Sequence, residues 1–150
     1  MEPQIILLAH NIRSLWNVGS FFRTADAMAV EKIILTGYTA QPPRREISKT
    51  AIGAEDWIDW EYKEDPIETI NQLKSDGWTV VGLELTDNAQ KISEYKASEK
   101  ICLVLGHEVT GVPEEIIRLC DSVVYIPMHG KKESLNVSVA AGIALDRLRN

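Results

Sequence analysis

The sequence predicts an α/β fold in which a largely parallel sheet is covered by helices on both faces. Short apolar runs alternate with helical patterns along the whole 150-residue chain, and the runs are apolar throughout instead of alternating with polar residues. Alternating strands and helices build parallel sheets, whose strands are apolar on both sides. Because 150 residues is an ordinary length for one domain, residues 1–150 are expected to form a single domain.

About six strands are expected, because the chain contains that many short apolar runs bounded by turn residues. Two long segments between them, residues 37–48 and 86–100, are polar or proline-containing and are predicted to be mainly loop. The predicted strands are residues 4–9, 32–36, 58–62, 78–83, 101–105 and 122–126.

The first helix is expected from Asn17, as its N-cap, to about residue 29, with apolar residues recurring at helical spacing. A second helix is expected at residues 49–56. Pro66 suits the first turn of the helix at residues 66–75. Further helices are predicted at residues 113–120 and from about residue 136 to the end of the chain.

The composition is that of an ordinary folded protein, with 45% hydrophobic and 25% charged residues. No apolar run approaches the roughly 20 residues of a membrane span. The first residues lack the basic region and cleavage site of a signal peptide, so a cytoplasmic location is expected. Cys102 and Cys120 form no disulfide framework, and Cys102 in the run ICLVLG is expected to be a buried thiol.

The net charge of −6 argues against a protein dedicated to nucleic acids, whose binding surface is usually basic, without excluding one. Local clusters of basic residues matter more than the sum. Two such clusters are candidate RNA contacts, and their alternative role is that of solvated surface loops. They are Arg44, Arg45 and Lys49, and Lys131 with Lys132.

The stretch at residues 126–141, IPMHGKKESLNVSVAA, passes from the end of a strand through a polar loop into a helix at about Asn136. Ligand sites of α/β proteins lie at such junctions, where backbone N–H groups and the helix dipole point outward. The last helix carries two apolar faces, and Gly142 with the alanines beside it keeps the helix thin, which predicts close neighbours on two sides. Val139 and Ile143 make the second face. The alternative is a terminal strand–helix unit that is simply well packed.

A second candidate site lies in residues 11–28, NIRSLWNVGSFFRTADAM. Arg23 stands among Phe21, Phe22 and Ala25, an unusual place for a solvated charge, so it is expected to be partly buried and paired. The alternative is an arginine that only stabilises the fold through a salt bridge.

The third candidate site is the segment LVLGHEVTGVP at residues 103–113. No Lys-Ser/Thr pair follows its second glycine, which excludes a P-loop, and the second histidine of a zinc protease is absent. The three histidines of the chain show no ligand spacing, so no metal site is expected. No G-x-G-x-x-G follows the first strand, which disfavours a dinucleotide-binding oxidoreductase.

Together these three stretches resemble the signature motifs of the SpoU (TrmH-like) RNA 2′-O-ribose methyltransferase family of the SPOUT superfamily. The resemblance implies S-adenosylmethionine as cofactor and a ribose 2′-hydroxyl of tRNA or rRNA as substrate. It also implies a homodimer whose interface completes the active site, and a C-terminal trefoil knot that forms the cofactor pocket. Ordinary packing rules do not predict a knot.

The resemblance also assigns roles to individual residues. Arg is a poor base, so Arg23 is expected to activate the hydroxyl by its charge. Glu108 is alternatively a surface acid or a partner of Arg23, and Asn136 is alternatively an N-cap. The implied catalytic residues are Arg23, Asn17, Glu108, Ser134 and Asn136, and the implied cofactor-binding residues are Leu85, Thr86, Gly106, Ile126, Met128, Ser134 and Leu135.

A competing hypothesis is a catalytically weak RNA-binding or assembly factor on the same fold. The acidic net charge favours it. The presence of Arg23, Glu108, Ser134 and Asn136 favours the enzyme.

Overall fold

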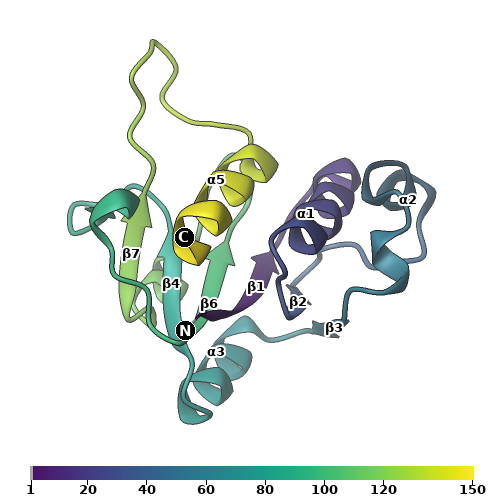
Figure 1. Ribbon diagram of the computed structural model, residues 1–150, viewed down its shortest axis with the longest axis horizontal. Helices are drawn as coiled ribbons and strands as arrows, with labels where there is room; N and C mark the ends of the chain where they lie inside the picture. Colours follow the sequence, from purple (N-terminus) through teal and green to yellow (C-terminus); the bar gives the residue numbers. More distant parts are fainter. Residues whose placement is uncertain (1) are drawn as a thin grey trace.

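The computed structural model describes residues 2–150, which contain one seven-stranded sheet in the order β3-β2-β1-β6-β4-β7-β5 (Figure 1). Every strand pairing is parallel, as predicted. The strands are β1 (Gln4–His10), β2 (Lys32–Thr36), β3 (Trp60–Lys63), β4 (Thr79–Leu83), β5 (Gln90–Lys91), β6 (Lys100–Leu105) and β7 (Ser122–Tyr125).

The chain leaves β1 in one direction to form β2 and β3, and then crosses to the other side, where β6 pairs with both β1 and β4. The carboxyl ends of all these strands meet at one edge of the sheet because the strands are parallel. A crevice opens outside such an edge where the direction of strand addition reverses. This topology therefore predicts a ligand site beyond the ends of β1, β6 and β4.

Three helices cover one face of the sheet: α1 (Leu15–Ala27), α2 (Arg45–Ala51) and α5 (Val137–Arg149). Figure 1 shows α1 between α5 and α2 on this face. Alternate strand residues such as Ile5 and Leu7 point into this layer, where they join the buried residues of α1 and α5. The N-terminal motif and the C-terminal helix are thus neighbours in space.

The opposite face is covered by α3 (Pro66–Ser75) and the short α4 (Glu114–Ile117). The intervening strand residues, Ile6 and Leu8 among them, pack here. Cys102 is fully buried in this layer, as predicted, and burial raises the pKa of its thiol. None of the helices within residues 2–150 is long and apolar enough to cross a bilayer.

The sheet has one strand more than predicted, because β5 lies in the segment expected to be loop. It consists of Gln90 and Lys91, which pair with Val124 and Tyr125 of β7. A two-residue polar strand at a sheet edge produces no apolar run, so the sequence pattern could not reveal it.

The N-cap of α1 is Ser14 and not Asn17, so the helix begins before the predicted position. The Ser14 side chain accepts a hydrogen bond from the backbone N–H of Asn17. Serine and asparagine are equally good caps, and the sequence does not distinguish them. Asn17 consequently lies in the first turn of the helix, where its side chain is available for another partner.

Two further helices differ from their predicted bounds. The helix α2 begins before residue 49 and ends at Ala51, because Ile52 and Gly53 adopt positive φ angles of 50° and 89°. A separate 3₁₀ turn, Ala54–Asp56, follows. The prediction for residues 113–120 was also too long: beyond Ile117 the chain tightens into three-residue turns.

Candidate active site

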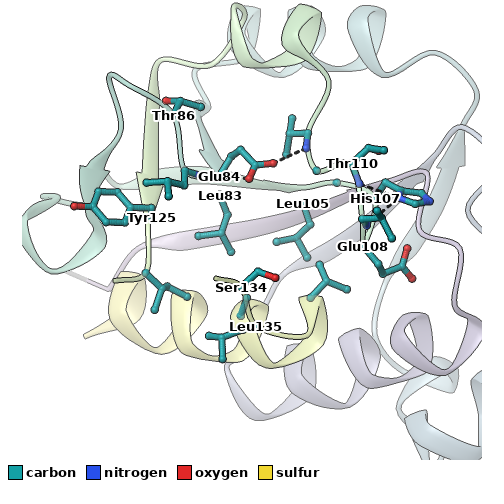
Figure 2. Close-up of a pocket in the computed structure, with 18 of the residues that line it drawn as sticks. Leu83, Glu84, Thr86, Leu105, His107, Glu108, Thr110, Tyr125, Ser134 and Leu135 are labelled. Atoms are coloured by element: carbon teal, nitrogen blue, oxygen red, sulfur yellow. Dashed lines mark hydrogen bonds between the residues drawn. The ribbon is translucent and has the colours of Figure 1, made fainter. Parts of the chain in front are cut away.

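A cavity of about 490 Å³ lies at the carboxyl ends of β4, β6 and β7, against the first turn of α5 (Figure 2). Its walls come from three segments: the end of β4, the loop after β6, and the chain between β7 and α5. Leu83, Leu105 and Leu135 give it an apolar lining, and its polar residues include Glu84, Thr86 and Ser134. The size and the mixed lining are those of a cofactor-sized pocket.

All seven predicted cofactor-binding residues line this cavity, although they come from three distant parts of the chain. The structure thus gathers the second and third sequence motifs around one space, together with the strand end near residue 85. These lining residues are Leu85, Thr86, Gly106, Ile126, Met128, Ser134 and Leu135.

The chain between β7 and α5 extends as a long excursion beyond the sheet (Figure 1). Ile126 and Met128 on one arm, and Ser134 and Leu135 on the other, line the cavity. Lys131 and Lys132, between the two arms, are exposed. The predicted basic pair therefore lies beside the pocket and not within its lining.

Asn136 is the N-cap of α5. Its Oδ1 atom accepts hydrogen bonds from the backbone N–H of Ser138, at 2.8 Å, and from the Ser138 hydroxyl, at 2.6 Å. The capping role considered for this residue is thereby confirmed. Asn136 does not belong to the cavity lining, but its neighbours Leu135 and Val137 do. Its cap fixes the direction in which the lining segment enters the helix.

The loop after β6, residues 106–112, is folded tightly on itself. His107 and Gly111 exchange backbone hydrogen bonds of 3.2 and 2.9 Å. The His107 Nδ1 atom accepts hydrogen bonds from the backbone N–H groups of Val109 and Thr110, which stabilise the turn (Figure 2). The backbone of this cavity wall is therefore held by its own hydrogen bonds.

Glu108 projects from this loop toward the start of α1. Its carboxylate accepts hydrogen bonds from the backbone N–H groups of Arg13, at 2.9 Å, and Ser14, at 2.7 Å, and from the Nδ2 amide of Asn17, at 3.1 Å. Burial would raise the pKa of this carboxyl, but the hydrogen bonds outweigh burial and lower it. Glu108 is thus an anionic partner of α1, and Arg23 is not among its contacts.

Asn17 is buried, with only 8% of its surface exposed, and its amide joins the first motif to the second through Glu108. A negative carboxylate at the N-terminus of α1 satisfies unpaired N–H groups and suits the helix dipole. The two predicted catalytic residues Asn17 and Glu108 are therefore brought together, with Glu108 in the cavity lining and Asn17 behind it.

The prediction that Arg23 is partly buried was wrong. Arg23 is exposed and is absent from the cavity lining. Its neighbours Phe21 and Phe22 are fully covered because the core-facing side of α1 turns them inward, and the same rotation turns Arg23 outward. Within residues 2–150 no ion pair involves Arg23.

The first basic cluster lies on α2 and its N-cap, and not in a loop as predicted. Arg44, Arg45 and Lys49 are all exposed there. The Lys49 ammonium lies 5.9 Å from the ring centre of Trp16, which is itself 48% exposed. This surface adjoins the N-terminal turn of α1.

Sequence reasoning gave little weight to Glu84 and missed Tyr125, both of which line the cavity. Glu84 directly precedes the predicted cofactor-binding residues Leu85 and Thr86, but no pattern in the sequence marks its carboxylate. Across residues 2–150 no group of three or more His, Cys, Asp or Glu side chains is arranged to hold a metal ion.

Comparison with known proteins gives relatives along nearly the whole chain. The tRNA (guanosine(18)-2′-O)-methyltransferase of Aquifex aeolicus is 31% identical over 96% of this chain and 68% of its own length. The 23S rRNA (guanosine(2553)-2′-O)-methyltransferase RlmP of Bacillus subtilis is 32% identical over 96% of this chain and 57% of its own.

Among solved structures, the AdoMet-bound rRNA methyltransferase of Sinorhizobium meliloti matches with a TM-score of 0.92 at 28% identity, over 99% of this chain and 57% of that one. The chain thus spans 57% to 68% of the length of these three proteins. The sequence profile of the SpoU rRNA methylase family matches residues 4–146. The resemblance seen in the three motifs is confirmed, and the chain belongs to the SpoU rRNA methylase family.

Proposed function

We propose that this protein is an S-adenosylmethionine-dependent methyltransferase that methylates a ribose 2′-hydroxyl in tRNA or rRNA. The observation that carries the proposal is the convergence of the three motifs: one cavity is lined by the predicted cofactor residues, and its wall is bonded through Glu108 to α1. The names of the relatives, which modify guanosine in tRNA and 23S rRNA, support this substrate class. Residues 1–150 form one methyltransferase domain in this proposal.

The cavity fits the cofactor on physical grounds. Its volume of about 490 Å³ suits a nucleoside with an amino acid side chain, and leucines from three segments of its lining suit an adenine ring. Gly106, Ile126, Met128 and Leu135 would hold the ring through apolar contact and backbone groups, with Leu85 and Thr86 closing one side. When bound, S-adenosylmethionine supplies a methyl group that is already reactive toward oxygen nucleophiles.

The remaining chemistry concerns the ribose hydroxyl, which is a poor nucleophile at neutral pH. Arg23 cannot accept a proton, so its contribution is positive charge beside the developing alkoxide and the adjacent phosphate. Glu108 and Asn17 hold the start of α1 against the cavity and so position the helix that carries Arg23. Asn136 caps α5 and so orders the chain before it, and Ser134 lines the cavity there, where the ribose would approach.

The homodimer is part of the same proposal. Six residues separate Arg23 from Asn17, which corresponds to about 9 Å along the helix and about 240° of rotation. Arg23 therefore points away from the side of α1 that contacts the cavity wall of its own chain. We place it in the active site of a second copy, packed across the exposed faces of α1 and α5. The exposed Val139 and Ile143 of α5 support this arrangement.

RNA would reach this site along the basic surfaces. Arg44, Arg45 and Lys49 on α2 and Lys131 and Lys132 beside the cavity supply positive charge in a chain that is otherwise acidic. The trefoil knot implied by the resemblance belongs to this proposal and concerns the segment between β7 and α5. A cytoplasmic location, where tRNA and rRNA are modified, is also part of it.

The deciding experiment is methyl transfer from labelled S-adenosylmethionine into total RNA that is then separated by size. The wild-type protein should label the tRNA or the rRNA fraction, and Arg23→Ala should abolish the label while cofactor binding persists. Arg118→Ala, which removes an exposed arginine from the opposite face of the sheet, is the matched control and should label RNA normally. Absence of label in every fraction, with cofactor binding intact, would indicate first an enzyme that needs a partner protein or a precursor RNA, and then the RNA-binding factor.

A further inference from the structure

We propose that Glu84 is a positioning residue for the cofactor site: its carboxylate fastens the loop of residues 106–112 to the end of β4 and so fixes one wall of the cavity. This inference rests on the proposed function, because it takes the cavity to be the S-adenosylmethionine site. It assigns a role to a carboxylate that no motif of the sequence singled out.

Glu84 is itself held firmly at the carboxyl end of β4. Its backbone N–H donates to the carbonyl of Val124 in the neighbouring strand β7 at 2.9 Å. Its Oε1 atom accepts from the N–H of Leu85 at 3.2 Å. The side chain therefore starts from an ordered part of the sheet and can act as a fixed support for a loop.

The other carboxylate oxygen reaches the loop after β6. Oε2 accepts a hydrogen bond of 2.9 Å from the backbone N–H of Val112, the last residue of the loop (Figure 2). Val112 directly precedes Pro113, the N-cap of α4, which has no side-chain cap of its own. Glu84 thus connects two separate segments of the cavity wall with one charge-assisted bond.

The same carboxylate explains why residue 111 is a glycine. Gly111 has a φ of +75°, and a Cβ atom there would overlap with Oε2 of Glu84. Gly111 in turn lies against Gly106, where a Cβ atom would overlap with the Gly111 carbonyl and the N–H of Val112. Glu84 therefore contacts the backbone of residues 111–112, and this backbone in turn contacts Gly106.

This series of contacts connects Glu84 to the proposed cofactor site, because Gly106 lines the cavity. If the bond to Val112 is lost, the loop keeps its own hydrogen bonds between His107 and Gly111 but loses this attachment to the end of β4, so the loop can shift against β4 and carry Gly106 with it. The expected consequence is weaker cofactor binding, because part of the binding free energy is then needed to order the loop. The chemical step should change little once the cofactor is bound.

The test compares Glu84→Ala and Glu84→Gln with the wild type in calorimetric binding of S-adenosylmethionine and in steady-state methyl transfer. Loss of a hydrogen bond to a charged group corresponds to a Kd increase of about tenfold or more. Glu84→Ala should show this increase in Kd and KM, with kcat within about twofold of wild type at saturating cofactor. Glu84→Gln keeps one acceptor oxygen for Val112, so its Kd should lie between the Kd of the wild type and that of Glu84→Ala.

Asp87→Ala is the matched control, because Asp87 is exposed in the same segment and its removal changes the charge equally. It should bind the cofactor like wild type. Wild-type affinity in both Glu84 variants would overturn the inference, as would a fall in kcat at unchanged KM. If the wild-type protein itself binds no S-adenosylmethionine, the proposed function fails. If the wild type binds S-adenosylmethionine and the Glu84 variants bind it equally well, only the inference about Glu84 fails.

A double-mutant cycle with Gly111 tests the contact even if single variants lose stability. Gly111→Ala should weaken cofactor binding strongly in the wild-type background and less in the Glu84→Ala background, because the overlap with the carboxylate is then gone. Additive effects of the two substitutions on cofactor binding would show that the Glu84 carboxylate does not act on this loop, and would overturn the inference.

Discussion

The Nδ2 amide of Asn17 donates a 3.1 Å hydrogen bond to the Oε2 atom of Glu108, across 91 residues of sequence. The same carboxylate accepts from the N–H groups of Arg13 and Ser14. One side chain of the cavity wall therefore bonds the residues at the start of α1 and connects them to the loop after β6. In the proposed enzyme this bond relates the cofactor pocket to the helix that bears Arg23.

Glu108→Gln should lower the stability of the protein in a pH-dependent manner. The folded-state pKa of Glu108 lies below its usual value of 4.5, so the carboxylate contributes stability that is present above that value and is lost as pH falls through the folded-state pKa. At neutral pH the variant should be less stable by about 1–2 kcal/mol. Urea unfolding between pH 7 and pH 3.5 should show the two proteins converging below about pH 4.5. A constant difference across this range would contradict the role of the ionised carboxylate.

Asn136→Ala should damage both cofactor binding and turnover, because it removes the cap that directs residues 134–136 into α5. The helix cap alone is worth about 1 kcal/mol. Asn136→Asp keeps an acceptor for the Ser138 N–H but removes the amide donor, and serves as the control. If Asp restores stability and activity together, Asn136 acts only as a cap. If Asp restores stability alone, the amide has a function in the site. Unchanged activity in the Ala variant would show that Asn136 is a cap alone, with no function in the site.

The contrast between Asn17 and Arg23 shows what sequence patterns can and cannot predict in this chain. The parallel sheet was predictable, because strands buried on both faces leave apolar runs, and the cavity was predictable from the motifs at the strand ends. The side on which Arg23 emerges follows from the apolar face of α1, which turns Phe21 and Phe22 inward. The start of α1 was not predictable, because Ser14 and Asn17 are equivalent caps in sequence. The contacts of Glu108 and Glu84 join segments far apart in the chain, so no local pattern encodes them.

Replacing Arg44 and Arg45 together by alanine should weaken RNA binding and leave cofactor affinity unchanged. Arg44 makes no side-chain capping bond to α2, and Arg45 is exposed, so the fold should tolerate the change. If each arginine contacts one phosphate, the slope of log K against log salt should decrease by about two. The double variant Lys63→Ala/Lys96→Ala removes the same charge from exposed positions elsewhere and is the control. Equal RNA binding by both double variants would show that α2 is not the contact.

Ile143→Glu should convert the protein to a monomer. Val139 and Ile143 are 50% and 37% exposed on one side of α5, and a carboxylate in the centre of an apolar interface would be costly to bury. Ile52→Glu changes the same residue type at the C-cap of α2, where Ile52 is 64% exposed. Figure 1 shows α2 on the side of α1 away from α5, so this change should leave the assembly intact. Light scattering coupled to size-exclusion chromatography measures both. A wild-type protein that is monomeric, or an Ile143→Glu dimer, would contradict an interface through α5.

Mixed dimers should determine whether Arg23 acts on the cavity of the other chain. Arg23→Ala has an intact cavity, and Ser134→Trp, in which a bulky side chain fills the cavity from an exposed position, has an intact Arg23. Each variant alone should be inactive.

After unfolding and refolding as an equal mixture, half of the dimers contain one chain of each variant. Each such dimer combines one intact cavity with the Arg23 of its partner. About a quarter of wild-type activity should then return. If Arg23 acts on its own chain, every site in the mixture lacks one component and no activity returns. Adding Ile143→Glu to both variants should abolish the recovery, which ties it to the α5 interface.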